Sequence, residues 1–105
     1  MTSPAGRAAP NTFTLEVVTP TCVAFTGPVT AVVAPAARGY LGILARHAPL
    51  LATLTPGTIT FRAPDGTVSS LHGAGGGILE VRDNRVTILA DQIAASAPFR
   101  GRIRG

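Results

Sequence analysis

Short segments in which polar and apolar side chains alternate restrict most strongly how this chain can fold. Within residues 12–19, the apolar side chains of Phe13, Leu15 and Val17 fall on one side of an extended chain, with polar residues between them. The segment 58–62 repeats this pattern. Successive side chains of a strand point to opposite faces, so both segments are predicted to be half-buried β-strands.

Turn-forming residue pairs separate these segments from other short apolar runs. Pro56-Gly57, Asp65-Gly66 and Asp83-Asn84 favour tight turns, and Gly27-Pro28 is predicted to end a strand. No stretch keeps helical periodicity over three turns. The pattern predicts an all-β fold, a two-sheet antiparallel β-sandwich of about eight to ten short strands. We expect strands near residues 12–19, 22–26, 29–34 (buried on both faces), 40–44, 50–55, 58–62, 67–72, 78–82 and 85–90.

The length and apolar content fit one domain with its own core. Of the 105 residues, 46% are hydrophobic, which is enough to bury a core in a domain of this size. We place the sandwich at residues 12–91, between a flexible N-terminal tail (1–11) and a short arginine-rich C-terminal tail (92–105). In the latter, residues 92–97 are expected to form at most a short helical piece. The predicted core residues are Phe13, Leu15, Val17, Ile59, Phe61, Leu79, Val86 and Ile88.

No segment approaches the ~20 apolar residues that a membrane-spanning helix needs. Residues 1–10 also lack the apolar run of a signal peptide, so we expect no membrane insertion and no export. The single cysteine, Cys22, cannot form an internal disulfide, and we expect it to be a small apolar residue on a strand.

The net charge of +4 suggests nucleic-acid binding until the charges are located. All nine basic residues are arginine, and four of them lie in the predicted tails: Arg7, Arg100, Arg102 and Arg104. The remaining five are balanced by the five acidic residues of the chain. A nucleic-acid reader normally carries its basic stripe and aromatic platforms on the fold, so that function is a weak alternative here.

The sequence shows no pattern of residues for catalysis, for metal binding or for a cofactor. The glycine-rich run 73–77 lacks the Gly-Lys-Ser/Thr of a phosphate loop, and it precedes a predicted strand instead of a helix. Such glycines more often mark a bulge or a close approach of two backbones. Cys22, His47 and His72 match no metal-ligand spacing, and no nucleophile motif accompanies them. We therefore expect no cofactor and no enzyme activity of the chain by itself.

The segment His47-Ala-Pro49 is predicted to form a shaped corner. Pro49 restrains Ala48 to an extended conformation and removes a backbone donor. On residue chemistry alone, a structural turn with an exposed histidine is the simpler interpretation. The apolar residues nearby are many for a loop region, and any that are not core would mark a protein–protein surface. They are Tyr40, Leu41, Ile43, Leu44, Leu50 and Leu51.

Four motifs, in order, resemble those of the ATP synthase epsilon subunit family (called delta in mitochondria). Arg38-Gly-Tyr-Leu-Gly-Ile-Leu-Ala-Arg-His-Ala-Pro-Leu-Leu51 is similar to the family's G-E-[LF]-G-I-L-P-x-H-A-P-L-L, and a Leu-x-Pro-Gly turn follows at residues 54–57. Gly75-Gly-Gly-Ile-Leu-Glu-Val81 resembles its G-G-[IF]-[LV]-E-V strand, and Asn84 to Asp91 resembles its closing N-x-V-T-[IV]-L-A-D. The resemblance covers residues 12–91.

The resemblance implies a non-catalytic central-stalk subunit that couples ion translocation to ATP synthesis. Its partners would be the gamma subunit and the c-ring, and indirectly the alpha/beta catalytic head. It would be a peripheral protein on the cytoplasmic face of the bacterial inner membrane. The ring-side contact would comprise Arg38, Gly39, Tyr40, Leu41 and Gly42, and the gamma-side contact would comprise His47, Ala48, Pro49 and Leu50.

Three departures from the family pattern change these expectations. Tyr40 stands where the family usually has Glu, so an acidic contact to the ring is missing, and Ala45 and Arg46 replace the usual Pro and small residue. The sequence after Asp91 does not continue into the family's two-helix domain, so we expect coupling without self-inhibition through those helices. Two alternatives remain: a free-standing ligand-binding β-sandwich, or an arginine-tailed nucleic-acid-binding protein.

Overall fold

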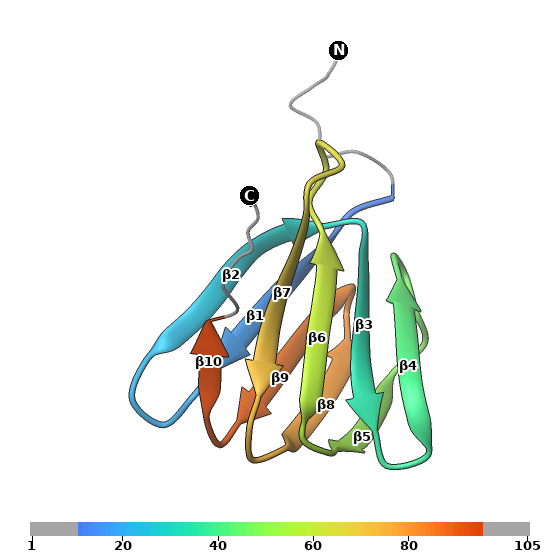
Figure 1. The fold of residues 1–105 in the computed structure, drawn as a ribbon. Helices are drawn as coiled ribbons and strands as arrows, with labels where there is room; N and C mark the ends of the chain where they lie inside the picture. The colour runs from blue at the N-terminus through green and yellow to red at the C-terminus, as the bar shows by residue number, and fades with distance from the viewer. Residues whose placement is uncertain (1–10, 96–105) are drawn as a thin grey trace.

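The computed structural model describes residues 11–95, and all regular structure assigned within them is β-strand (Figure 1). The strands are β1 (Phe13–Val18), β2 (Val23–Val29), β3 (Ala31–Ala36), β4 (Gly39–Leu44), β5 (Leu50–Leu54), β6 (Gly57–Arg62), β7 (Val68–Gly73), β8 (Gly77–Arg82), β9 (Arg85–Ala90) and β10 (Ile93–Ala95). Among the described residues there is no helix that could span a membrane. Of the predicted tails (1–11 and 92–105), residues 1–10 and 96–105 lie outside the described residues.

The strands form two layers that share one continuous path of pairing (Figure 1). One sheet has the order β10-β7-β6-β3-β4, and the other has the order β5-β8-β9-β1-β2. The sheets join where Ala36 of β3 pairs with Leu54 of β5. The predicted two-sheet all-β sandwich is confirmed.

One strand pair departs from the predicted antiparallel arrangement. β1 runs parallel to β9, with Leu15 opposite Val86 and Val17 opposite Ile88. Parallel neighbours cannot be joined by a tight turn, and here almost the whole domain lies between them in sequence. Arg85 and Glu16 form an ion pair of 2.9 Å across this pair.

The core lies between the two sheets and contains all eight residues predicted from the alternating pattern. The inward faces of β1, β6, β8 and β9 supply them, as a period of two requires. The structure adds seven further buried residues to this core: Val29, Val32, Ala34, Ile43, Leu54, Val81 and Ala90.

Three local expectations were wrong. β2 continues through Gly27-Pro28, because it pairs only with β1 and an edge strand tolerates a proline. Val33 of β3 is 40% exposed, so this strand is not buried on both faces. Cys22 lies exposed just before β2, with its Sγ 3.4 Å from the hydroxyl of Thr19.

For residues 92–97 we expect at most a short helical piece, and in the described part of this range residues 93–95 instead form the strand β10. Residues 96 and 97 lie outside the described residues. β10 pairs with the edge of β7 and brings Ile93 against the core. So few residues seldom hold a helix by themselves, whereas the neighbouring strand satisfies their backbone groups directly.

The glycine-rich run connects the two sheets between β7 and β8. A Cβ on Gly77 would overlap the carbonyl oxygen of Leu89, and one on Gly76 would lie 2.7 Å from the carbonyl oxygen of Leu54. Gly76 also has φ of 79°. The prediction that these glycines mark a close approach of backbones is confirmed.

Candidate partner-binding site

The two stretches that resemble family contact surfaces lie on one side of the sandwich, where β4 and β5 end their sheets (Figure 1). β4 pairs only with β3. β5 pairs with β8 along its length but meets β3 only at Leu54. The two sheets are therefore not closed against each other along most of this side.

An open groove of about 500 Å³ runs between the two edge strands. It contains five of the nine predicted contact residues, namely Arg38, Gly39, Tyr40, Leu41 and Leu50. Gly42 follows on β4, whereas His47, Ala48 and Pro49 lie in the connection to β5. The remaining lining residues are Ala36, Ala37, Leu51, Ala52 and Thr53, so no carboxylate lines the groove.

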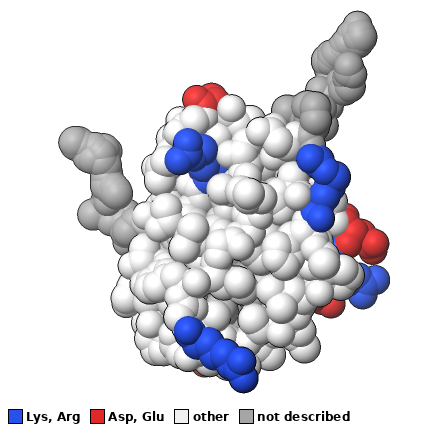
Figure 2. All heavy atoms as spheres, turned by 90° about the vertical axis from the view of Figure 1, so that its right-hand side faces the viewer, with Lys and Arg blue, Asp and Glu red and all other residues white. Residues whose placement is uncertain are grey.

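Large apolar side chains stand exposed around this groove. Tyr40 and Leu44 of β4 are 64% and 66% exposed, and Leu51 of β5 is 71% exposed. Figure 2 shows this side of the molecule, with separated arginine side chains, acidic side chains at the right-hand edge and at the top, and uncharged surface over most of the rest. Leu41 and Leu50 line the groove but are half-buried and pack against the core, so each contributes to both the groove and the core. An apolar surface of this kind suits contact with another protein.

The side chain of Tyr40 lies near Pro35 of β3 and Gly57 of β6. Tyr40 is opposite Pro35 in the β3–β4 pairing, and Pro35 is buried. A Cβ on Gly57 would lie 2.9 Å from Cγ of Pro35 and 3.3 Å from the hydroxyl of Tyr40. The absence of a side chain at Gly57 therefore leaves room for the tyrosine side chain to reach β6.

The corner between β4 and β5 is fixed by a residue from another hairpin. Arg46 has φ of 61°, and its backbone N–H donates to Oδ1 of Asn84 over 2.6 Å. His47 is half-buried, with its Nδ1 2.7 Å from the carbonyl oxygen of Ala48. The predicted corner exists, but its anchor, Asn84, lies 38 residues further along the chain.

The hairpin before β4 presents Arg38 at the other end of that strand. Ala37 and Arg38 form the turn, and Gly39 takes φ of 122°, which a residue with a side chain rarely adopts. Arg38 is exposed, and no ion pair involves it within the described residues. The two predicted contact stretches thus begin at opposite ends of β4.

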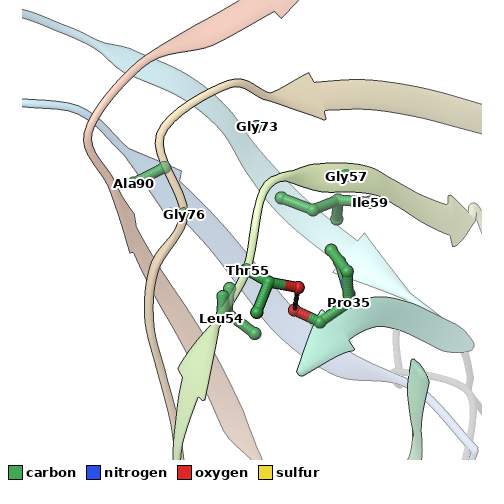
Figure 3. Close-up of a pocket in the computed structure, with 8 residues that line it drawn as sticks. All are labelled: Pro35, Leu54, Thr55, Gly57, Ile59, Gly73, Gly76 and Ala90. Atoms are coloured by element: carbon green, nitrogen blue, oxygen red, sulfur yellow. Dashed lines mark hydrogen bonds between the residues drawn. The ribbon is translucent and has the colours of Figure 1, made fainter. Parts of the chain in front are cut away.

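A small apolar cavity of about 10 Å³ lies where the sheets join (Figure 3). Thr55 donates from its backbone N–H and its hydroxyl to the carbonyl oxygen of Pro35, over 2.8 and 3.4 Å. This volume is at the lower limit for a single water molecule, so the cavity is not a ligand site. Within residues 11–95, no group of three His, Cys, Asp or Glu side chains could hold a metal ion.

The sequence reasoning missed a second exposed apolar surface, on the outer face of the other sheet. Ile78 of β8 pairs with Leu89 of β9, and Leu89 pairs with Val18 of β1. Ile78 and Leu89 are exposed. The available signal was an apolar residue at an outward position of an otherwise alternating strand.

Comparisons with known proteins agree on one family. Residues 12–96 match the family described as ATP synthase, Delta/Epsilon chain, beta-sandwich domain. Among curated proteins, the ATP synthase epsilon chain of Dichelobacter nodosus is 42% identical over 81% of this chain and 59% of its own length. That of Rhodopseudomonas palustris is 43% identical over 84% of this chain and 63% of its own. The chain thus spans about three fifths of the length of these relatives.

Solved structures show the same fold. A chain of the Euglena gracilis mitochondrial ATP synthase, solved as an OSCP/F1/c-ring assembly, superposes with a TM-score of 0.76 at 22% identity and covers 89% of this chain and 59% of that one. A chain of the Tetrahymena thermophila central stalk and c-ring assembly gives 0.67 at 18% identity, covering 88% of this chain and 76% of that one.

Proposed function

The chain belongs to the ATP synthase delta/epsilon chain family through its β-sandwich domain, and we propose that it acts as the epsilon subunit of an F-type rotary ATP synthase. In this role it is a central-stalk component that helps to couple ion translocation to ATP synthesis. The observation that carries the proposal is the open apolar groove between β4 and β5, because it coincides with the stretches that resemble family contact surfaces.

The proposed partners are the gamma subunit and the c-ring. Residues 38–42 contact the ring, and residues 47–50 contact gamma. The start of these stretches at opposite ends of β4 supports two separate contacts on one side of the sandwich. The names of the solved neighbours, which are assemblies that include a c-ring and in one case the central stalk, support a place in an assembly of this kind.

The proposed role is non-catalytic and places the protein at the membrane surface. The groove offers mainly apolar side chains, with the guanidinium of Arg38 and the hydroxyls of Tyr40 and Thr53 as its polar side-chain groups, and no carboxylate, thiol or imidazole lines it. Such a lining suits contact with a protein. Contact with the c-ring puts the subunit at the cytoplasmic face of the bacterial inner membrane, as a peripheral protein.

Reconstitution with epsilon-depleted ATP synthase tests this function. Wild-type chain is expected to bind the depleted complex and to raise the ratio of ATP synthesis to ion flow. Tyr40→Asp is expected to weaken binding at least tenfold, because a carboxylate replaces an exposed apolar ring in the proposed interface.

Val68→Asp is the matched control, since Val68 is also an exposed apolar strand residue but lies on β7, away from the groove. It is expected to bind like the wild type. Failure of the wild-type chain to bind would overturn the proposed function. If Tyr40→Asp lowers the melting temperature of the isolated chain as well as its binding, the loss of binding would instead reflect a structural role of Tyr40 in the fold.

A further inference from the structure

The main chain of β4 has an open edge. The hairpin at Ala37 and Arg38 closes with Ala36 opposite Gly39. On the other side of β3, the Ala37 N–H donates to the carbonyl oxygen of Thr53, and the Thr55 N–H donates to the carbonyl oxygen of Pro35. Successive residues of a strand direct their backbone N–H and C=O groups to opposite sides, so those of Ala36 point toward β4.

Because backbone groups alternate along an antiparallel pair, this orientation also shows which residues of β4 bond to β3 and which point away from it. Leu41 and Ile43 bond to β3, opposite Ala34 and Val32. The N–H and C=O groups of Tyr40, Gly42 and Leu44 point away from β3, toward the groove side of the strand. Three residues of β4 thus present backbone donors and acceptors to which a further strand can bond.

Side chains leave this edge accessible. A Cβ built on Gly42 meets no atom within 4 Å, so the centre of the edge is uncovered. Tyr40 and Leu44, on either side of it, are exposed apolar residues. Leu51 on the facing wall offers a further exposed apolar contact to an inserted segment.

The charges around the edge specify the chemistry of its occupant. Arg38 precedes β4 and Arg46 follows it, both are exposed, and no carboxylate lines the groove. A second copy of this chain, paired antiparallel about Gly42, would bring Arg38 of one copy opposite Arg46 of the other. The sequence 96–105, with three arginines and no acidic residue, carries the same sign. Like charges directly opposite each other disfavour pairing, so neither is a suitable partner.

We propose that the open edge of β4 binds an extended segment of a partner protein, which adds as a strand and carries a carboxylate near each end. β4 has six residues, so the paired part of the segment spans roughly 20 Å. Arg38 and Arg46 lie in the turns on either side of β4, so one or two further residues at each end reach them and the segment is about nine residues long. Backbone bonds to residues 40, 42 and 44 provide the pairing, and the two arginines provide the selectivity. The inference deepens the proposed ring-side contact, which uses Arg38–Gly42, by naming the form of the bound segment.

Peptide binding to the full 105-residue chain tests this edge directly. The probe is a nine-residue peptide of alternating valine and threonine with aspartate at both ends, and its counterpart has lysine at both ends. With the acid-ended peptide, hydrogen exchange of the Tyr40, Gly42 and Leu44 amides is expected to slow at least tenfold. The lysine-ended peptide is expected to bind at least fivefold more weakly. Equal binding of the two peptides, or protection at other strands only, would overturn the proposal.

Gly42→Pro and Gly42→Ala form the matched pair of variants. Proline removes the outward N–H at the centre of the edge without removing a bond to β3, and it blocks strand addition there. The expected result is at least tenfold weaker peptide binding for Gly42→Pro and less than a twofold change for Gly42→Ala. Similar binding by both variants would contradict strand addition.

A charge variant keeps the test decisive if Gly42→Pro does not fold. Arg38→Glu is expected to lower the preference for the acid-ended peptide at least threefold, and an unchanged preference would overturn the assigned selectivity. The outcome is separable from that of the proposed function. A chain that binds the peptide at this edge but not the depleted ATP synthase would refute the function alone, and the reverse result would refute the edge alone.

Discussion

The side chain of Asn84 connects three segments that are far apart in the sequence. Its Oδ1 accepts from the backbone N–H of Arg46, and its Nδ2 donates to the carbonyl oxygen of Thr12 over 2.9 Å. Its own φ is 57°, and that of Asp83 beside it is 52°, as a tight hairpin turn requires. One residue thus closes the β8–β9 turn, holds the corner before β5 and fixes the entry to β1.

Asn84→Gly is expected to lower the free energy of unfolding by about 1–2 kcal/mol, because glycine keeps the positive φ but loses both side-chain bonds. Asn84→Asp keeps the acceptor for Arg46 and is expected to lose about half as much. Urea denaturation measures both. Asp83→Gly, in the same turn, is the control and should stay within about 0.5 kcal/mol of the wild type. A loss for Asn84→Gly no larger than that of the control would show that the bridging bonds are unimportant.

Asp65 gives the stability of the β6–β7 turn a dependence on pH. Its Oδ1 accepts from the Thr67 N–H over 2.9 Å, and this backbone bond, with a second one to the Thr67 side chain, lowers the pKa of Asp65 below 3.8. A lowered pKa in the folded state contributes stability at pH values above the unfolded pKa of 3.8. That contribution is lost as the pH falls through the lower folded value.

Asp65→Asn keeps an oxygen acceptor but does not titrate. The difference in melting temperature between wild type and Asp65→Asn is therefore expected to be constant from roughly pH 6 to 8. Below about pH 4, the melting temperature of the wild type is expected to fall relative to that of Asp65→Asn. Thermal melts across this range measure the difference. A difference that does not change with pH would contradict the role assigned to the ionised carboxylate.

At the scale of elements, the alternating strands supply one face each to a shared core. Phe61 of β6 is buried, and its ring centroid lies 4.3 Å from that of Phe25 on β2. These two strands belong to different sheets, so the aromatic pair links the layers.

Phe61→Ala is expected to cost about 3–5 kcal/mol of unfolding free energy, because it leaves a cavity between the sheets. Denaturant unfolding of this variant is compared with that of Arg62→Ala, an exposed neighbour on the same strand that should change stability by about 0.5 kcal/mol or less. A loss below about 1 kcal/mol for Phe61→Ala would mean that the register of β6 differs from the one described.

The connection between β7 and β8 depends on a glycine for a different reason, namely the close approach of backbones. Gly77→Ala places a Cβ onto the Leu89 carbonyl and is expected to cost about 1–3 kcal/mol or more. Gly42→Ala, whose Cβ would meet nothing within 4 Å, is the control and is expected to be close to neutral. Denaturation curves that coincide for the two variants would show that the connection can relax without cost.

At the scale of the whole molecule, the described residues form a sandwich of strands. Under the proposed function, we expect the 105-residue chain, added to epsilon-depleted ATP synthase, to improve coupling without ATP-reversible inhibition of hydrolysis. Hydrolysis is measured with and without the chain across ATP concentrations.

Deletion of residues 99–105 serves as the companion experiment. It is expected to change neither coupling nor hydrolysis much, because it removes three arginines, and an ion pair at a protein surface contributes only about 0–1 kcal/mol. Strong inhibition that ATP relieves, and that this deletion abolishes, would contradict the expectation. It would assign a regulatory role to the arginine-rich segment.

The sequence by itself determined the strands and the inward face of most of them. In residues 13–18 and 57–62, strand formation and the identity of the buried side chains follow from one local property, the period of two. The turn pair Asp83-Asn84 likewise fixes the β8–β9 hairpin locally, because few residues accept its positive φ values.

Only the tertiary structure decided which strands are neighbours and which edges stay open. The parallel pairing of β1 with β9, the strand at residues 93–95 and the bonds of Asn84 all join residues that are distant in sequence. The exposure of Tyr40, Leu44 and Leu51 also depends on where the two sheets fail to close. A local pattern states which side chains share a face. Whether that face or edge meets a neighbour depends on how the whole chain packs its two sheets together.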